Sequence, residues 1–176
     1  MKTTGVVRRI DDLGRIVIPK EIRRNLRIRD GESLEIFVED EMIALKKYSS
    51  MNDLNDICKD LVNTINQVLL KNVLITDRDS VIAISGNNKN AYFKKNISKY
   101  LEEKLNDREI ITEKSITEIE FIDGLKEKYS YTITPIITNG DVMGSVIIFS
   151  ENENINDTDV KLASFAANFL GKHIEE

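Results

Sequence analysis

The sequence predicts an α+β protein made of two unlike parts, a small basic unit followed by a larger acidic one. At 176 residues the chain is long enough for two small domains. Residues 1–50 carry 11 basic and 9 acidic side chains, a balance of +2, whereas residues 51–176 carry 14 and 21, a balance of −7. Strand-like runs of alternating apolar residues are mixed with amphipathic helical runs, which favours antiparallel strands combined with helices.

The first 29 residues are basic, whereas the chain as a whole is acidic. They hold nine Lys or Arg against three Asp or Glu, a local balance of +6, in a protein of net charge −5. Seven of the nine arginines lie here: Arg8, Arg9, Arg15, Arg23, Arg24, Arg27 and Arg29. Apolar β-branched residues are interleaved with them, which is not typical of a disordered basic tail. A folded basic unit indicates a polyanionic partner, most often nucleic acid.

The basic unit has a ββαββ pattern in about 48 residues. Its expected elements are strands at Thr3–Ile10 and Arg15–Pro19 around a turn with Gly14, a helix at Lys20–Leu26, and a hairpin of Ser33–Glu39 with Met42–Lys47. A unit of this size is too small to bury an adequate core alone, and it has no disulfide or metal to compensate. We therefore expect two copies to interleave and share one core.

The acidic part follows a short linker and helix start at residues 51–55, so we place the domains at 1–50 and 56–176. Its expected elements are helices at 54–69, 98–105 and 157–174, and strands at 73–76, 81–85, 116–122, 129–138 and 142–149. The last two strands are joined by Asn139-Gly140, a strong turn signal. These elements predict a roughly five-stranded antiparallel sheet with helices before and after it.

The residue inventory argues against several classes of protein. One cysteine, Cys58, and one histidine, His173, cannot form an intrachain disulfide, an all-N/S zinc site or a recognisable nucleophilic triad. We expect no catalytic residue, no metal and no cofactor, and an inert, packed Cys58 thiol. No apolar run is long enough to span a bilayer, so we expect no membrane partner and a cytoplasmic, nucleoid-associated protein.

The chemistry of the basic unit favours duplex DNA over single strands. It has no aromatic residue before Phe37, whereas single-strand and RNA binders stack bases on aromatic side chains. The arginine fork grips phosphate and reads guanine in the major groove. For Arg27 and Arg29, surface ion pairs with acidic neighbours such as Glu32 and Glu35 are an equal alternative to contact with DNA.

The stretch TGVVRRIDDLGRIVIPKEIRRNLRIRDGESLEIFVEDEMIALKKY resembles the swapped-hairpin DNA-binding domain of the AbrB transition-state regulators. The resemblance implies a β-barrel-like homodimer through residues 1–50 and a homotetramer through the C-terminal domains. It also implies DNA contacts by Arg8, Arg15, Arg23 and Arg24, with weaker claims for Arg9, Lys20 and Arg27.

Residues 51–176 are similar to a GAF domain, a fold that commonly encloses small molecules. The resemblance implies a possible small-molecule effector, with Ser85, Tyr92 and Phe93 as pocket candidates. The run Ser85–Lys89 lacks the P-loop pattern, and the N-K-x-F-D-E pattern of cyclic-nucleotide GAF domains is absent. The sequence leaves open whether this part of the chain senses a ligand or serves only in assembly.

The resemblance implies a transcriptional regulator of sporulation genes, both activator and repressor. An alternative is an antitoxin-like autoregulator of a toxin–antitoxin operon, because related swapped-hairpin domains serve there. The strand-rich tail argues against that alternative, since such a tail is expected to be short and disordered before it binds a toxin. An enzyme is disfavoured by the missing acid–base or metal constellation.

Overall fold

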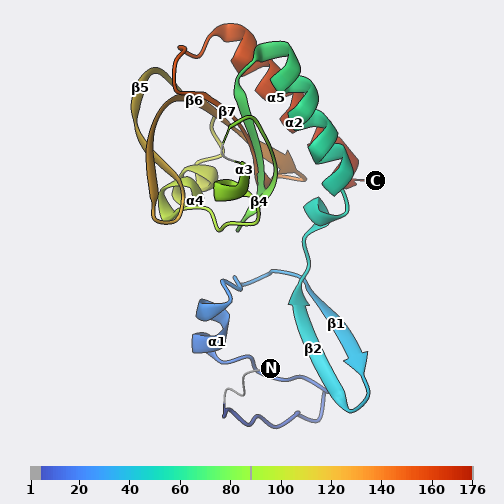
Figure 1. Cartoon of the computed structure of the whole chain (residues 1–176). Helices are drawn as coiled ribbons and strands as arrows, with labels where there is room; N and C mark the ends of the chain where they lie inside the picture. Colours follow the sequence, from blue (N-terminus) through green and yellow to red (C-terminus); the bar gives the residue numbers. More distant parts are fainter. Residues whose placement is uncertain (1–4, 88, 176) are drawn as a thin grey trace. The chain divides into compact units, whose positions relative to one another are not determined.

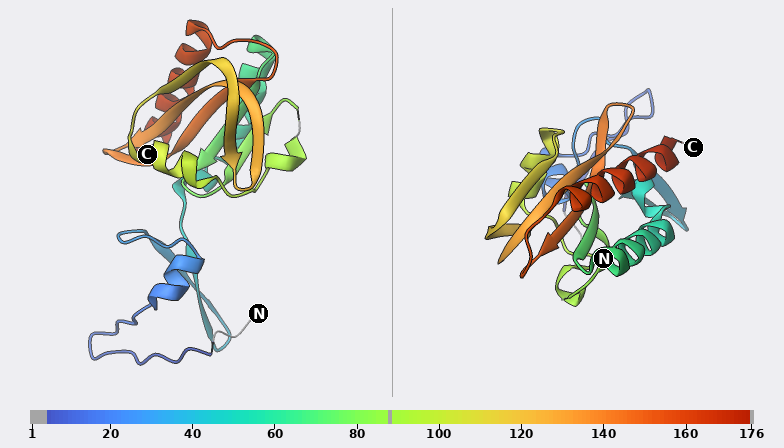
Figure 2. Two further views of the ribbon diagram at one scale, coloured as in Figure 1. Left: turned by 90° about the vertical axis from the view of Figure 1, so that its left-hand side faces the viewer. Right: turned by 90° about the horizontal axis from the view of Figure 1, so that it is seen from above.

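The structure, a computed structural model, describes residues 5–87 and 89–175 (Figure 1). The chain divides into two compact units, the first ending at Tyr48 and the second beginning at Ser49. The first unit has one short helix and one hairpin, and the second has a five-stranded sheet with helices on both faces (Figures 1 and 2). The two-part organisation therefore coincides with the change of charge along the sequence.

The first unit is built around helix α1 (Lys20–Asn25) and the antiparallel strands β1 (Leu34–Glu39) and β2 (Met42–Lys47). Pro19 stands immediately before α1, where its missing N–H is no loss. In the hairpin, Ile36 pairs with Leu45 and Val38 with Ile43, which puts four apolar side chains on one face. The hairpin and the helix confirm the sequence prediction to within one residue.

The two strands expected near the N-terminus are not present in this chain. Residues 5–10 and 15–19 are extended but belong to no strand, and Thr3 and Thr4 lie outside the described residues. The turn between them forms as expected, with Gly14 at φ +77° and its N–H donating to the Asp11 carbonyl. A strand needs a neighbour for its backbone groups, and a sequence pattern does not say which chain supplies it.

The second unit is a sheet of order β4-β3-β7-β6-β5, with every neighbouring pair antiparallel. Its strands are β3 (Asn72–Asp77), β4 (Val81–Ser85), β5 (Ile111–Ile122), β6 (Leu125–Thr138) and β7 (Asp141–Ser150). Its helices are the 3₁₀ turn η1 (Ser50–Asn52), α2 (Asn55–Leu69), α3 (Lys89–Tyr92), α4 (Lys99–Asn106) and α5 (Asp157–Glu175). The expected five-stranded antiparallel sheet with flanking helices is confirmed.

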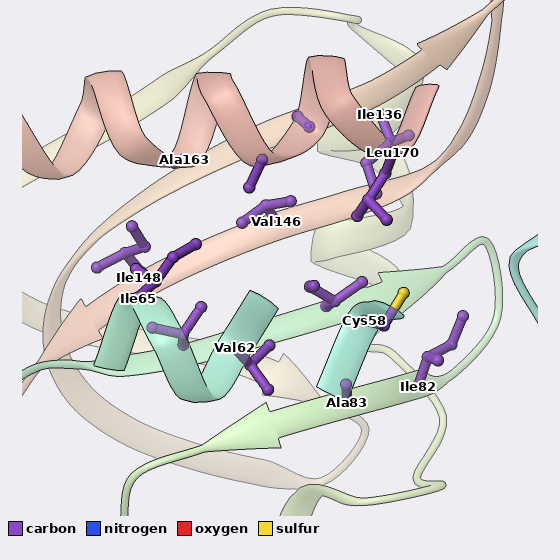
Figure 3. Close-up of a cluster of buried hydrophobic side chains, with 14 of the residues drawn as sticks. Cys58, Val62, Ile65, Ile82, Ala83, Ile136, Val146, Ile148, Ala163 and Leu170 are labelled. Carbon is purple, nitrogen blue, oxygen red and sulfur yellow. The ribbon is translucent and has the colours of Figure 1, made fainter. Parts of the chain in front are cut away.

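One face of this sheet is covered by α2 and α5. Cys58, Val62 and Ile65 from α2 meet Val146 and Ile148 from β7 and small residues of α5 (Figure 3). The alanines of α5 and Gly171 allow the helix to approach closely, since a Cβ on Gly171 would lie 2.7 Å from the Ile137 carbonyl oxygen. Tight packing of this kind leaves little room for a ligand between α5 and the sheet.

The opposite face is covered by α3, α4 and a cluster of aromatic rings. Phe121 stacks on Tyr129 and meets Phe149 edge-on, with ring centroids 6.0 and 5.4 Å apart. Tyr92 from α3 is 1 % exposed, and its hydroxyl contacts that of Tyr129 at 3.2 Å and the Glu127 carboxylate. Burial, together with the Glu127 contact, raises the pKa of Tyr92 and raises that of Tyr129 to about 12. Both hydroxyls therefore stay protonated near neutral pH.

A buried ion pair joins the start of β3 to the first turn of α5. Lys71 Nζ lies 2.6 Å from Asp159 Oδ2, and the two side chains are 3 % and 0 % exposed. The ammonium also donates to the Asn154 carbonyl at 3.0 Å, and Asp159 accepts from the Asn156 amide at 2.8 Å. A charge buried this deeply is tolerated only when it is paired and hydrogen-bonded.

Candidate nucleic-acid interface

The arginines of the first unit lie on three segments. Arg8 and Arg9 are exposed in the extended stretch before the turn, and Arg15 follows the turn. Lys20 begins α1, while Arg23 and Arg24 lie in its last turn, where basic side chains complement the helix dipole. The seven candidate DNA-binding residues of the sequence analysis all fall within this one unit.

The turn that carries Arg15 is organised by a single carboxylate. Asp11 Oδ1 accepts hydrogen bonds from the amides of Leu13 and Arg15 at 3.1 and 2.7 Å. Asp11 Oδ2 accepts from Arg15 Nε at 2.8 Å. The amide and then the side chain of Arg15 hold the pKa of Asp11 below its usual 3.8. The backbone amide and the Nε of Arg15 are therefore held in place, while its side chain remains 71 % exposed.

Arg23 is held in a similar way by an acidic residue from the next turn. Its Nη1 contacts the Asp30 carboxylate, whose side chain is 93 % exposed. The Nε of Arg23 is buried and has no hydrogen-bond partner among the described residues. The carbonyl of Arg23 also accepts from the Ile28 amide at 2.7 Å, which folds the chain back after α1.

Arg29 has a structural role that the sequence left open. Its Nη1 lies 2.9 Å from Glu32 Oε1, and its amide donates to Oε2 at 3.0 Å. Lys47, at the end of β2, lies 3.2 Å from the same carboxylate and donates to the Arg27 carbonyl at 2.8 Å. Glu32 thus ties the loop after α1 to the hairpin. Arg29 accordingly stays outside the candidate contacts.

Sequence reasoning missed three acidic residues that hold the arginines of the first unit: Asp11, Asp30 and Glu32. It named Glu32 only as a possible surface partner of Arg27 and Arg29. The one available signal was spacing: Asp11 and Arg15 are four residues apart, and an aspartate that opens a turn commonly accepts amides two residues on. The Arg23–Asp30 pair spans a reversal of the chain, which no local pattern predicts.

The first unit leaves an unusual amount of apolar surface in contact with solvent. Pro19 is its one buried residue within positions 5–48. The exposed apolar side chains are Val6, Val7, Ile10, Leu13, Ile16, Val17, Leu26, Ile36, Phe37, Val38, Ile43, Leu45 and Tyr48. So many exposed apolar side chains in a unit of this size indicate an interaction site.

The outer sides of α2 and α5 carry a second apolar surface. Val68 on α2 and Phe165 on α5 are 66 % and 60 % exposed, and the Phe165 and Phe169 rings stack at 6.2 Å. Leu61 and Leu162 are only partly buried beside them. The two helices lie against the same sheet face in Figure 1, so these side chains belong to one face of the second unit.

The three expected pocket residues do not share a cavity. Ser85 lines a polar cavity of about 350 Å³ together with Asn72, Lys71 and the start of the following loop. Tyr92 is buried in the aromatic cluster, and Phe93, the next residue, is 42 % exposed beside a different groove.

Two further features of the described residues concern metal binding and membranes. In the described part of the chain, no three His, Cys, Asp or Glu side chains gather as metal ligands would. Across residues 5–87 and 89–175, no helix combines the length and apolar character needed to cross a bilayer.

Family models match both parts of the chain. Residues 53–175 match the family model described as stage V sporulation protein T C-terminal, transcription factor. Residues 7–53 match the model described as antidote-toxin recognition MazE, bacterial antitoxin.

Individual relatives agree with this division. Stage V sporulation protein T of Bacillus subtilis is 46 % identical over 100 % of both chains. The transition state regulatory protein AbrB of the same organism is 60 % identical over 48 residues, 27 % of this chain and 50 % of that protein. The GAF domain of an Acinetobacter phosphoenolpyruvate-protein phosphotransferase covers 74 % of this chain and 84 % of its own, at 13 % identity and a TM-score of 0.54.

These matches define a two-part protein with an AbrB-type first unit and a GAF-type second unit. The chain belongs to the stage V sporulation protein T family of transcription factors.

Proposed function

We propose that the protein regulates transcription in spore formation by binding duplex DNA through its first unit. The observation that carries this proposal is the arginine-rich surface of that unit, within a stretch 60 % identical to a transition-state regulator. Arg8, Arg15, Arg23 and Arg24 are the proposed contacts, with smaller contributions from Arg9, Lys20 and Arg27. The family of residues 53–175 favours this role over that of an antitoxin, and favours regulation over catalysis.

The proposed contacts are of two kinds. Arg15 and Arg23 each have one nitrogen engaged by an aspartate. This leaves both terminal nitrogens of Arg15 to meet phosphate oxygens, but in Arg23, whose Nε is buried, chiefly the second terminal nitrogen. Arg8 and Arg24 are exposed, and no ion pair holds them within the described residues. These two are suited to groove edges, where arginine reads guanine bidentately.

We propose that two copies of the first unit form the DNA-binding dimer. The apolar face of the hairpin, with Ile36, Val38, Ile43 and Leu45, is 42–75 % exposed in the single chain. An isolated two-stranded hairpin is marginal in water. A second copy would cover this face and provide neighbours for the extended residues 5–10 and 15–19.

We also propose that α2 and α5 join two such dimers into a tetramer. Their exposed Val68 and Phe165 form an apolar surface on the side away from the sheet. Packing against the same helices of another copy would bury it in a helical bundle. The protein would then act as a soluble, nucleoid-associated tetramer.

DNA binding is tested by fluorescence anisotropy on a labelled duplex. The double variant Arg23→Ala/Arg24→Ala should weaken binding at least tenfold, since each lost arginine contact is worth about 1–3 kcal/mol. Arg108→Ala removes an exposed arginine of the second unit and is the matched control, which should bind as the parent does. Unchanged affinity in the double variant would contradict the assignment.

Assembly is tested by light scattering coupled to size exclusion. Phe165→Ser should convert tetramers to dimers without loss of the first-unit dimer. Val38→Ser/Ile43→Ser should instead disrupt the DNA-binding dimer and abolish DNA binding. A parent protein that is monomeric at micromolar concentration would overturn both interfaces.

A further inference from the structure

A groove of about 300 Å³ lies between α2, β4 and α3, at the edge of the sheet. Its apolar lining comes from Val62 on α2 and from Ala83 and Ile84 on β4, all less than a tenth exposed. Figure 3 shows Val62 on α2 and Ala83 on the neighbouring β4. Phe93, 42 % exposed, adds an aromatic wall. The groove is therefore apolar within, at the lower end of the size range of ligand sites.

The groove is also locally basic. Lys59 and Lys89 line it, and its lining contains no acidic residue. Lys94 lies with its Nζ 5.4 Å from the Phe93 ring centroid. Lys59 has one partner, Asp56 at 3.0 Å, and that pair is exposed to solvent. The unit as a whole carries −7, yet the segment 86–101 has four lysines and no Asp or Glu.

We propose that this groove binds a small organic acid with a compact apolar body. The carboxylate would be held by Lys89 and Lys59, and the apolar body would lie on the exposed Phe93 ring and the edge of Ile84, with Val62 and Ala83 as the buried floor beneath. The amides of Asn63 and Asn90, also in the lining, provide neutral donors for the same carboxylate. Buried apolar surface supplies affinity in such a site, and a few polar groups at its mouth fix the orientation.

The chemistry of the groove selects this class over others. A fully polar anion such as inorganic phosphate would leave the Phe93 ring and the apolar floor of the groove uncovered. The polar cavity near Ser85 has the opposite character: asparagine amides line it together with Lys71, which Asp159 already neutralises, and with Lys89, which it shares with the groove. An anion with an apolar body therefore fits the groove and not that cavity.

The chain has no tryptophan, so Phe93→Trp places a single fluorescent reporter on the groove wall. Benzoate, titrated into the full-length variant with excitation at 295 nm, should change the emission saturably with a Kd of about 1 mM or tighter. Benzamide has the same shape without the charge and should bind at least tenfold more weakly. Equal binding of the two probes, or no saturable change with benzoate, would overturn the proposal.

Substitutions locate the site. Lys59 lines the groove and not the polar cavity, whereas Lys89 lines both. Lys59→Gln and Lys89→Gln in the reporter background should each raise the Kd for benzoate about tenfold, whereas Lys99→Gln, an exposed lysine outside the groove, should leave it unchanged. A Kd that responds to Lys89→Gln but not to Lys59→Gln would place benzoate in the polar cavity and overturn the proposal. Saturation-transfer NMR of benzoate with the natural Phe93 chain excludes an effect of the tryptophan, and its signal should fall in Lys89→Gln. A Kd insensitive to Lys89 in both measurements would place the probe elsewhere and overturn the proposal. Benzoate binding is measured without DNA, so its failure would overturn this proposal and leave the proposed function untouched.

Discussion

Asp11 holds Arg15 with both of its carboxylate oxygens, one on the backbone amide at 2.7 Å and one on Nε at 2.8 Å. The side chain is thereby oriented before any partner arrives, while 71 % of it stays open to solvent. A planar guanidinium has five donors, so it can satisfy this aspartate and a phosphate at once. In the proposed interface, this pair orients Arg15 before DNA binds.

Replacing Arg15 with lysine tests this orientation without changing the charge. Lysine has no fork with which to hold Asp11 and phosphate together, so we expect Arg15→Lys to lose about tenfold in DNA affinity. The salt dependence should stay the same, because the number of cations is unchanged. Anisotropy titrations at several salt concentrations check both points, and an Arg15→Lys variant with parental affinity would contradict the oriented contact.

If Arg23 contacts DNA as proposed, its ion pair with Asp30 competes with that contact. The side chain of Asp30 is 93 % exposed, so Asp30→Asn should leave the fold intact while it frees the guanidinium and removes a negative charge. We expect DNA affinity to rise severalfold at low salt, and this gain to shrink as salt screens the charges. Asp107→Asn, in the second unit, is the control. Weaker DNA binding by Asp30→Asn would mean that the ion pair supports the contact instead of competing with it.

Glu32 makes the first unit sensitive to acid. Burial alone would raise the pKa of Glu32, but the hydrogen bonds from Arg29 and the charge of Lys47 outweigh it and hold the pKa below the ordinary 4.5. The stabilisation is therefore complete above pH 4.5 and is lost as the pH falls through the lower, folded value. Hydrogen exchange of Met42–Lys47, corrected for intrinsic rates, should speed up in that window. In Glu32→Gln the protection should be lower at neutral pH and lack this acid step.

Cys58 should resist thiol reagents while the second unit is folded. Burial raises the pKa of its thiol to about 12, so at pH 8 only about one molecule in 10⁴ carries a thiolate. Ellman's reagent should react with the chain's single thiol only after urea unfolds the unit. Stoichiometric reaction within minutes in native buffer would show that α2 opens readily from the sheet.

Elements with local signals were predictable from the sequence. The Asn139-Gly140 turn has positive φ at both residues, +51° and +83°, as a tight hairpin between β6 and β7 requires. The apolar stripe on α2 and the alternation of apolar residues in β1 were equally local signals. Strand β5, by contrast, begins at Ile111 and not at the expected Ile116, because its polar first half is defined by pairing with β6 across an irregular register. Pairing of that kind cannot be predicted from the residues of the strand alone.

The candidate nucleic-acid interface was likewise predictable from the sequence only in part. Composition alone located the arginines, since their excess opposes the net charge. It did not identify Asp11 and Asp30 as their partners, because those contacts depend on the turns of the folded chain. Nor did it separate Tyr92 from Phe93: both are aromatic and adjacent, yet one fills the core and the other faces a groove.

The salt dependence of DNA binding tests the central claim most directly. Four arginines in each of two copies neutralise roughly eight phosphates, so log K should fall with log[salt] at a slope of about −7. The Arg23→Ala/Arg24→Ala variant removes about four of those contacts, and its slope should be about −4. A parental slope near zero, or the same slope in both proteins, would contradict binding of duplex DNA through this arginine surface.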